Sequence, residues 1–593
     1  MKKNRENIHL LCAAAAAIFL VVGPPTANAQ TPAAGPAFAD LPVVRPVMEC
    51  AQLKGMNLSA MAGVAMAISA AEVKRDGPAP YCEVHGYVSP QVDFEMVLPT
   101  TNWTQRYVQN GCGGLCGSTG TPRAGGDDNG PSQRGELALA TTGAGHVGGD
   151  GVWAADDPEL RIDFAYRAVH VTSLAAKALI EKYYGQKPKF SYFIGSSEGG
   201  REAAMEAQRF PDDFNGISCG SPALQFITQN TFYHAWNAVH NSDDSGHAIL
   251  TPDKLPILHA AAMAACDAQD GLKDGMIADP RACHFDPSVV QCKPGDDPAT
   301  CLTAAQVNVA REVYKGAHDD KGEQVIISGP FPGSELSWTQ FVPANLDMTR
   351  AGGAVLANSL LKYMAFPKNP PLNYKLTDFH FDLATFKAIA PMHAIYDAVD
   401  PDLSKFAAAG GKIIMSHGWA DSAISPVNTV AYYVAMKSLM GEDRVKQFSR
   451  LYMIPGRYHG ASGDTGPIAL DTLSPVMSWV EKGAAPNSLM TTYQAAPANA
   501  TGGRGGGRGA GRGAAAPAAP LKVLRTRPVF PYPLVAQYKG SGSIDDAANF
   551  QAVMPSAALP EKFNWMGNSF FNPHYEEWCG WTGMSFACGK EPR

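Results

Sequence analysis

The chain has 593 residues, a formal net charge of −7 and 17% charged residues. This length allows a large buried core and predicts either several domains or one domain with a large insertion. The negative charge argues against nucleic acid or an anionic membrane as the main partner, and nothing in the composition predicts an oligomeric state.

The first residues are typical of a secretory signal peptide. Basic residues near the start precede an apolar run from Leu10 to Val22, and a small-residue Ala-x-Ala motif ends at Ala29. This order predicts a signal peptide over residues 1–29. The apolar run is too short for a membrane span, and no other stretch reaches roughly 18 unbroken apolar residues. We therefore expect a periplasmic or secreted protein.

The cysteine content suits a compartment that permits disulfide bonds. The chain has 12 cysteines, and Cys12 lies in the expected signal peptide. Sequence does not fix connectivity, but proximity favours five pairs: Cys50–Cys82, Cys112–Cys116, Cys266–Cys283, Cys292–Cys301 and Cys579–Cys588. Cys219 is left over, and its apolar, strand-like surroundings predict a buried free thiol.

Residues 81–99 alternate and cluster like two paired strands, typical of the antiparallel start of a mixed sheet. A later strand, 106–109, leads into a glycine-rich loop over residues 110–117, whose backbone N–H groups can turn toward one point. Such a loop can provide one N–H of an oxyanion hole. The alternative is a plain glycine turn held by Cys112 and Cys116.

Residues 190–210 are predicted to form a strand, a sharp turn and a helix. The turn, Gly195 to Gly199, has the G-x-S-x-G pattern of a nucleophile elbow, in which the serine backbone is strained and its flanking residues must be small. This register predicts Ser197 as the nucleophile and the Glu198 N–H as an oxyanion-hole donor. The alternative is a chance Gly/Ser turn.

Two later strands lead to a candidate acid and a candidate base. Strand 412–416 precedes Asp421, and strand 450–455 precedes His459. The chain order Ser, Asp, His is the one that the α/β-hydrolase sheet imposes, so we predict Ser197 as nucleophile, His459 as base and Asp421 as the acid that orients it. His417 is a rival base. We interpret it as a pocket residue, with a structural histidine as the alternative.

The interval between Ser197 and Asp421 is longer than a bare hydrolase core requires, which predicts an inserted domain above the active site. We expect the catalytic domain over residues 30–221 and 392–555, and a lid domain over 222–391. A Gly/Ala/Arg-rich stretch, 496–520, is predicted to be a flexible loop, and residues 556–593 a C-terminal extension.

The predicted insertion contains an aspartate-rich loop with glycines that permit tight turns. Its carboxylates and carbonyls suit a hard cation, and calcium fits best, with these expected ligands: Asp267, Asp270, Leu272, Asp274 and Met276. The spacing differs from that of an EF-hand, and a solvated Asp/Gly loop is the alternative.

Together these features resemble the tannase and feruloyl esterase family of α/β-hydrolases, which also includes mono(hydroxyethyl) terephthalate hydrolases. The resemblance covers most of the mature chain and also rests on residues 148–151, 163–170 and 538–550. It implies an α/β-hydrolase fold with a mostly parallel sheet and a large inserted lid. It also implies the triad above, Gly113 with Glu198 as the oxyanion hole, and a structural calcium ion.

Several positions depart from the family pattern. Members usually carry a cysteine just before the nucleophile and another just after the histidine, where this chain has Ser196 and Gly460. Because both are missing together, we predict an active enzyme with a less rigid triad. By position, Lys362 and Phe366 resemble the lid residues that hold a carboxylate and an aromatic ring in terephthalate-ester hydrolases, whereas Ile424 replaces an aromatic residue.

The predicted function is therefore a secreted serine ester hydrolase that cleaves aromatic esters of feruloyl or galloyl type through an acyl-enzyme. The alternatives are mono(hydroxyethyl) terephthalate hydrolysis, peptidase activity, and a non-catalytic binding protein on a hydrolase scaffold.

Overall fold

The computed structural model describes residues 38–120, 122, 130–464, 466–495, 521–555, 561–583 and 585–589. The predicted signal peptide and the predicted flexible loop over 496–520 lie outside the described residues. Residues 36–593 form one compact unit, and the division of this unit into catalytic and lid domains stays a prediction.

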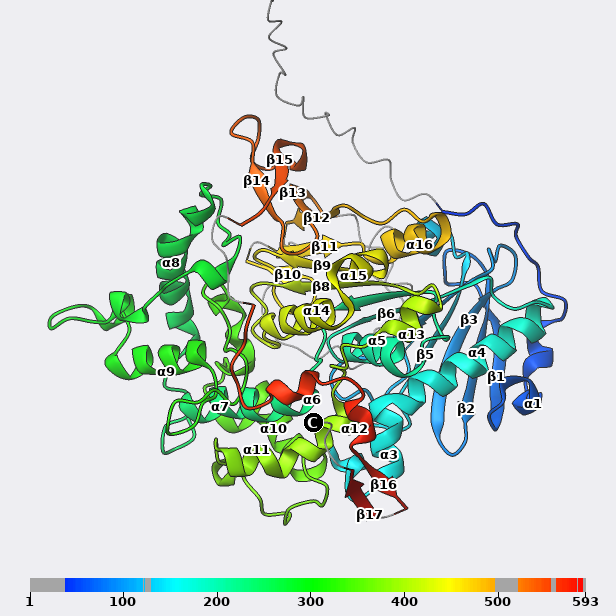
Figure 1. Ribbon diagram of the computed structural model, residues 1–593, viewed down its shortest axis with the longest axis horizontal. Helices are drawn as coiled ribbons and strands as arrows, with labels where there is room; N and C mark the ends of the chain where they lie inside the picture. The colour runs from blue at the N-terminus through cyan, green and yellow to red at the C-terminus, as the bar shows by residue number, and fades with distance from the viewer. Residues whose placement is uncertain are drawn as a thin grey trace, which may run out of the picture. The chain divides into compact units, whose positions relative to one another are not determined.

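A nine-stranded sheet organises the fold (Figure 1), in the spatial order β1-β2-β3-β5-β4-β6-β7-β8-β9. The pairs β1–β2, β2–β3 and β3–β5 are antiparallel, and all pairs from β5 to β9 are parallel. The sheet is thus mostly parallel with an antiparallel start, as predicted. Its strands are β1 (Met66–Lys74), β2 (Tyr81–Val88), β3 (Val92–Pro99), β4 (Arg106–Asn110), β5 (Leu137–Thr142), β6 (Phe190–Ser196), β7 (Gly216–Gly220), β8 (Lys412–Gly418) and β9 (Ser449–Ile454).

Helices cover both faces of the sheet. Helices α4 and α5 contact one face and α16 the other. Side chains that are neighbours in a strand pack on opposite faces, because successive residues of a strand alternate in direction. Phe193 and Ile413 belong to the core on the α4 and α5 side, whereas Tyr192 and Ile414 belong to the core under α16. Strands buried on both faces read as continuous apolar runs, as these do.

The helices outside the long β7–β8 connection lie before, between and after the strands. They are α1 (Ser59–Ala62), α2 (Gly130–Gln133), α3 (Pro158–Ile162), α4 (Ala168–Tyr184), α5 (Glu198–Arg209), α14 (Val427–Met440), α15 (Glu442–Phe448) and α16 (Leu473–Lys482). None of the described helices is both long and apolar enough to cross a bilayer.

The connection between β7 and β8, called the insertion here, is helical and contributes no strand to the nine-stranded sheet. Figure 1 shows most of its helices, in green, grouped beside the sheet, whereas α13 lies against α5. They are α6 (Phe226–Thr228), α7 (His234–His240), α8 (Leu255–Cys266), α9 (Ala304–Lys315), α10 (Gly352–Tyr363), α11 (Leu383–Ile389), α12 (His393–Tyr396) and α13 (Ser404–Ala408).

Three small sheets follow β9: a four-stranded sheet β10-β11-β12-β13 and the hairpins β14–β15 and β16–β17. Their strands are β10 (Ser462–Gly463), β11 (Gly466–Leu470), β12 (Leu489–Gln494), β13 (Val523–Val529), β14 (Val535–Tyr538), β15 (Phe550–Val553), β16 (Cys579–Thr582) and β17 (Ser585–Cys588). The C-terminal extension is tied to the chain before β8, because the Val399 N–H donates to Tyr575 Oη at 3.2 Å and the His574 N–H to Asp400 Oδ2 at 2.8 Å.

All five predicted cysteine pairs are joined as disulfides. Cys219, on β7, is a buried free thiol, as expected. Burial raises the pKa of this thiol, so the side chain behaves as a small core residue.

Candidate active site

Ser197 lies at the sharp turn between β6 and α5, with a backbone φ of 65° and ψ of −120°. Non-glycine residues rarely adopt this conformation, and it is held here by close packing of the flanking glycines. A Cβ at Gly195 would lie 2.0 Å from the Gly199 carbonyl oxygen, and one at Gly199 would lie 2.7 Å from the Cys112 oxygen. The geometry is that of a nucleophile elbow, with Ser197 at its tip.

His459 connects the serine to a buried carboxylate. Its Nε2 atom lies 2.9 Å from Ser197 Oγ, and its Nδ1 atom lies 2.7 Å from Asp421 Oδ2. The other carboxylate oxygen of Asp421 accepts the N–H groups of Ala423 at 2.9 Å and Ile424 at 3.0 Å. The three predicted triad residues therefore meet at the carboxyl ends of β6, β8 and β9.

The charges around the hydrogen-bonded residues Ser197, His459 and Asp421 suit proton transfer. Burial opposes the charged form of Asp421, but the charge of His459 and hydrogen bonds from both neighbouring histidines hold its pKa below the ordinary value. Burial likewise opposes the charged form of His459, and the adjacent Asp421 carboxylate outweighs it and raises the His459 pKa. The pair thus stabilises an imidazolium.

His417 does not line a pocket, which corrects the interpretation made from sequence. It is fully buried, with Nε2 3.2 Å from Asp421 Oδ2 and Nδ1 2.7 Å from Thr429 Oγ1. His417 is the penultimate residue of strand β8, and there its side chain contacts the acid instead of the cavity. Asp421 is therefore held between two histidines.

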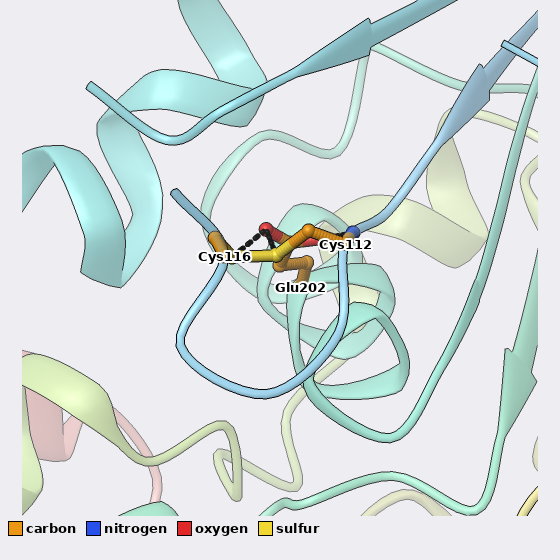
Figure 2. A group of neighbouring side chains, drawn as sticks. All are labelled: Cys112, Cys116 and Glu202. Carbon is orange, nitrogen blue, oxygen red and sulfur yellow. Dashed lines mark hydrogen bonds between the residues drawn. A yellow bond between two sulfur atoms is a disulfide. The ribbon is translucent and has the colours of Figure 1, made fainter. Parts of the chain in front are cut away.

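The glycine-rich loop after β4 carries Gly113, one of the two predicted oxyanion donors, and it packs against the start of α5, which carries the other, Glu198. Figure 2 shows Cys112 and Cys116 joined by a disulfide, with Glu202 of α5 beneath them. The Cys112 N–H donates to Glu202 Oε2 at 2.9 Å, and the Gly199 N–H donates to the Cys112 oxygen at 2.9 Å. These bonds fix the loop to the helix that begins at the elbow.

The N–H groups of Gly113 and Glu198 donate to no acceptor among the described residues. Both residues line the cavity that contains Ser197. The Glu198 N–H is the first of α5, where backbone donors are unsatisfied within a helix. Two such donors beside a nucleophile are what an oxyanion hole requires.

Two buried acids, Glu198 and Glu202, lie in the first turns of α5, directly after the elbow. Glu198 pairs with the fully buried Arg201, whose Nε donates to Glu198 Oε1 at 2.7 Å, and burial still raises the Glu198 pKa. Burial and then the neighbouring charge of Glu198 raise the pKa of Glu202. The raised pKa favours the neutral acid, which limits the charge buried under the loop.

A cavity of about 750 Å³ opens beside Ser197 and is bounded by the sheet loops and by the insertion. Of the four predicted pocket residues, Ile424 lines it, whereas His417, Lys362 and Phe366 are absent from its described wall. Phe366 packs against Tyr374 instead. Lys362 is in the last turn of α10 and Phe366 follows the helix, whereas the cavity-lining residue Leu356 is near its start.

Sequence reasoning missed the cavity residues that the insertion supplies: Phe226, Asn230, His234, Gln340 and Leu356. Phe226, Asn230 and His234 are spaced four residues apart, so they share one face of the continuous helical segment from α6 through the π-helix η4 (Gln229–Tyr233) to α7. The two polar residues Asn230 and His234, four apart in a buried helical segment, were the signal from which this part of the cavity wall could have been predicted.

Hydrogen bonds hold the His459 loop at the point where family members carry a cysteine. The Arg457 Nε–H donates to the Gly460 oxygen at 2.8 Å, and the Tyr458 N–H donates to the Ser462 oxygen at 2.8 Å. Gly460 has a φ of 78°, a conformation that favours glycine. The predicted lower rigidity of this triad stays a prediction.

The expected calcium ligands lie in one loop after α8. Asp267 accepts the N–H groups of Asp274 and Met276, each at 3.2 Å, and Asp274 Oδ2 pairs with Arg527 at 2.7 Å. The described carboxylates of this loop do not gather within 4.8 Å of one another. Burial and the charges of the neighbouring aspartates raise the pKa of Asp270. The oxygen-only donors and their mutual repulsion fit a hard cation.

The model of the family described as "Tannase and feruloyl esterase" matches residues 72–553. The chain belongs to this family. An uncharacterized esterase of Xanthomonas campestris pv. campestris is 32% identical over 517 residues, which are 80% of this chain and 84% of that protein. The mono(2-hydroxyethyl) terephthalate hydrolase of Piscinibacter sakaiensis is 29% identical, over 80% of this chain and 85% of that enzyme.

Among solved structures, feruloyl esterase B from Aspergillus oryzae superposes with a TM-score of 0.68 at 25% identity, covering 82% of this chain and 97% of that one. The predicted α/β-hydrolase fold is thereby confirmed, and the protein is a carboxylic ester hydrolase.

Proposed function

We propose that this esterase cleaves aromatic carboxylic esters, of feruloyl or galloyl type, by a serine mechanism. The observation that carries the proposal is the hydrogen-bonded chain from Ser197 through His459 to Asp421, with its 2.9 Å and 2.7 Å contacts. The cavity beside it has apolar walls that suit an aromatic ring, including Phe226, Leu356 and Ile424.

In this mechanism Ser197 Oγ attacks the ester carbonyl carbon while His459 Nε2 takes the hydroxyl proton. The N–H groups of Gly113 and Glu198 stabilise the oxyanion that forms. His459 then returns the proton to the alcohol oxygen, which leaves, and an acyl-enzyme on Ser197 remains. Water, deprotonated by His459, attacks this acyl group; the bond to Ser197 Oγ breaks, His459 returns the proton to that oxygen, and the acid is released. Asp421 keeps the imidazole oriented throughout.

A panel of methyl ferulate, methyl gallate and mono(2-hydroxyethyl) terephthalate tests the substrate class by kcat/KM. We expect both phenolic esters to exceed the terephthalate ester. The terephthalate alternative is favoured by the similarity to the Piscinibacter sakaiensis enzyme, and a higher kcat/KM for that ester would establish it. Lys362 and Phe366, its expected ligands, lie outside the described cavity wall, which supports the phenolic esters.

Burst release of p-nitrophenol from a p-nitrophenyl ester separates catalysis from mere binding. We expect a burst with the wild type and a kcat lower by about 10⁶-fold for Ser197→Ala, since the members of a triad act as a unit. Equal turnover by both proteins would reject the serine mechanism. Cleavage of an anilide, which contains an amide bond, tests the peptidase alternative, and we expect no cleavage.

Export and calcium binding are part of the same proposal. Five disulfide bonds support an oxidising location outside the cytoplasm. N-terminal sequencing of the mature protein should begin at Gln30. Asp267, Asp270 and Asp274, with the Leu272 and Met276 carbonyls, would hold calcium, which would cross-link the loop and take no part in the ester chemistry.

A further inference from the structure

Three uncharged polar residues of the insertion line the cavity that contains the catalytic residues. Asn230 comes from η4, His234 begins α7, and Gln340 ends the 3₁₀ helix η10 (Glu335–Gln340). All three line the same cavity as Ser197 and His459. They are not needed for the proton transfers described above.

His234 is the unusual member of this group. It is 2% exposed, and its Nδ1 atom is buried without a hydrogen-bond partner among the described residues. A Cβ at Gly353 would lie 3.0 Å from this Nδ1 atom, so helix α10 closes that side of the ring. Nε2 is then the ring nitrogen open toward the cavity.

Other buried histidines of the described chain have at least one ring nitrogen bonded to the protein: His393 Nδ1 lies 2.8 Å from Asp397 Oδ2, although its Nε2 has no partner among the described residues. His146 lies 3.2 Å from the Ala144 oxygen through Nδ1 and 2.7 Å from the Leu115 oxygen through Nε2. A buried polar group without a partner is costly, and its presence calls for an explanation. A ligand in the cavity cannot reach the Nδ1 atom of His234, which α10 covers, so the hydrogen bond that a ligand can add is the one at Nε2.

The helix around His234 is also irregular. Residues 229–233 form a π-helix between the α-helical turns α6 and α7. Single π-helical turns occur frequently at functional sites, because the extra residue changes the direction of the side chains that follow. The distortion thus places His234 at the cavity after Asn230.

Among the described residues, the polar end of the cavity carries no cation. Burial, and then the charge of His459, lower the pKa of His234 to about 4, so the ring is neutral at neutral pH and can both donate and accept. The amides of Asn230 and Gln340 have the same capacity. Within the described wall there is no lysine or arginine.

A phenolic hydroxyl matches this end, because it also donates one hydrogen bond and accepts others. A carboxylate matches it poorly, because a buried anion requires a cationic partner. We propose that Asn230, His234 and Gln340 form a hydroxyl-recognition subsite, with His234 as the residue that makes the esterase prefer hydroxylated aromatic acids. This inference rests on the proposed function, since the ring must belong to an ester bound at Ser197.

The test compares two substrates that differ only by the hydroxyl: methyl 4-hydroxycinnamate and methyl cinnamate. We expect the wild type to prefer the hydroxylated ester in kcat/KM. In His234→Leu this preference should fall roughly three- to tenfold, the effect of one neutral hydrogen bond, because the loss on the hydroxylated ester exceeds the loss on the cinnamate ester by that factor. His234→Gln, which keeps a donor and an acceptor, should restore part of the preference.

His240→Leu is the matched control, because His240 ends the same helix and is absent from the described cavity wall. It should keep the wild-type preference. Equal losses on both esters in His234→Leu, or an unchanged preference, would overturn the subsite. A higher kcat/KM for monomethyl terephthalate than for methyl 4-hydroxycinnamate would also overturn it. Failure of the wild type to cleave any of these esters would instead contradict the proposed function.

Discussion

The hydrogen bonds of Asp421 determine how the base is held and when it is neutral. His459 must be uncharged to accept a proton, so activity falls as the pH drops through its pKa. Asp421 raises that pKa. In Asp421→Asn we therefore expect the acidic limb of the kcat/KM profile to move to lower pH, together with a loss of kcat of about 10⁴-fold. A pH profile with an unmoved acidic limb would contradict this assignment.

His417 offers a second test at the same carboxylate. Because it contacts Asp421 and not the cavity, His417→Phe should lower kcat and leave KM near wild type. Its contribution is one hydrogen bond to a charged group, which corresponds to roughly ten- to a hundredfold in kcat. A rise in KM at constant kcat would support the original interpretation of His417 as a pocket residue. Steady-state kinetics on methyl ferulate distinguish the two results.

The glycine-rich loop after β4 is the element whose shape matters most for the oxyanion. Its disulfide joins residues on both sides of Gly113, and Glu202 holds it from α5. We expect Cys112→Ala/Cys116→Ala to lower kcat by about tenfold, less than the 10²- to 10³-fold cost of removing an oxyanion donor outright. The measurement is kcat for the folded variant, with folding checked by thermal unfolding.

The disulfide Cys292–Cys301 of the insertion provides the matched control, since its cysteines do not line the active-site cavity. Cys292→Ala/Cys301→Ala should lower the melting temperature and leave kcat unchanged. If both double variants lose kcat equally, the effect reflects stability in general, and the loop has no special role.

The elements that could be predicted from sequence are those with a local signature. The elbow, the two later triad strands and the cysteine pairs are set by short motifs and by strand ends, and Ser197, Asp421 and His459 followed from them. The cavity wall could not be predicted in this way. Phe226, His234 and Gln340 line one cavity only through the packing of the insertion. The side-chain direction of His417 depends on how it packs at the end of strand β8.

The proposed calcium ion would stabilise the fold by joining ligands from both ends of the aspartate-rich loop, Asp267 to Met276. Ligand present at 100 times its Kd adds about 2.7 kcal/mol to the free energy of unfolding. We therefore expect the melting temperature of the full-length enzyme to fall after EGTA treatment and to recover with added calcium. A melting temperature independent of calcium would contradict the site.

Asp270→Asn is the matched variant for that experiment. The Leu272 N–H donates to Asp270 Oδ1 at 2.9 Å, and an asparagine oxygen can keep this bond while the charge is removed. The variant should fold and lose the response to calcium.

The most direct test of the account is the identity of the residue that becomes covalently modified. Treatment with a fluorophosphonate, followed by peptide mass spectrometry, should place a single adduct on Ser197 and abolish esterase activity in parallel. Ser196→Ala should be labelled as readily as the wild type, and Ser197→Ala should not be labelled. An adduct on Ser196, or full activity after complete labelling of Ser197, would contradict the serine mechanism proposed here.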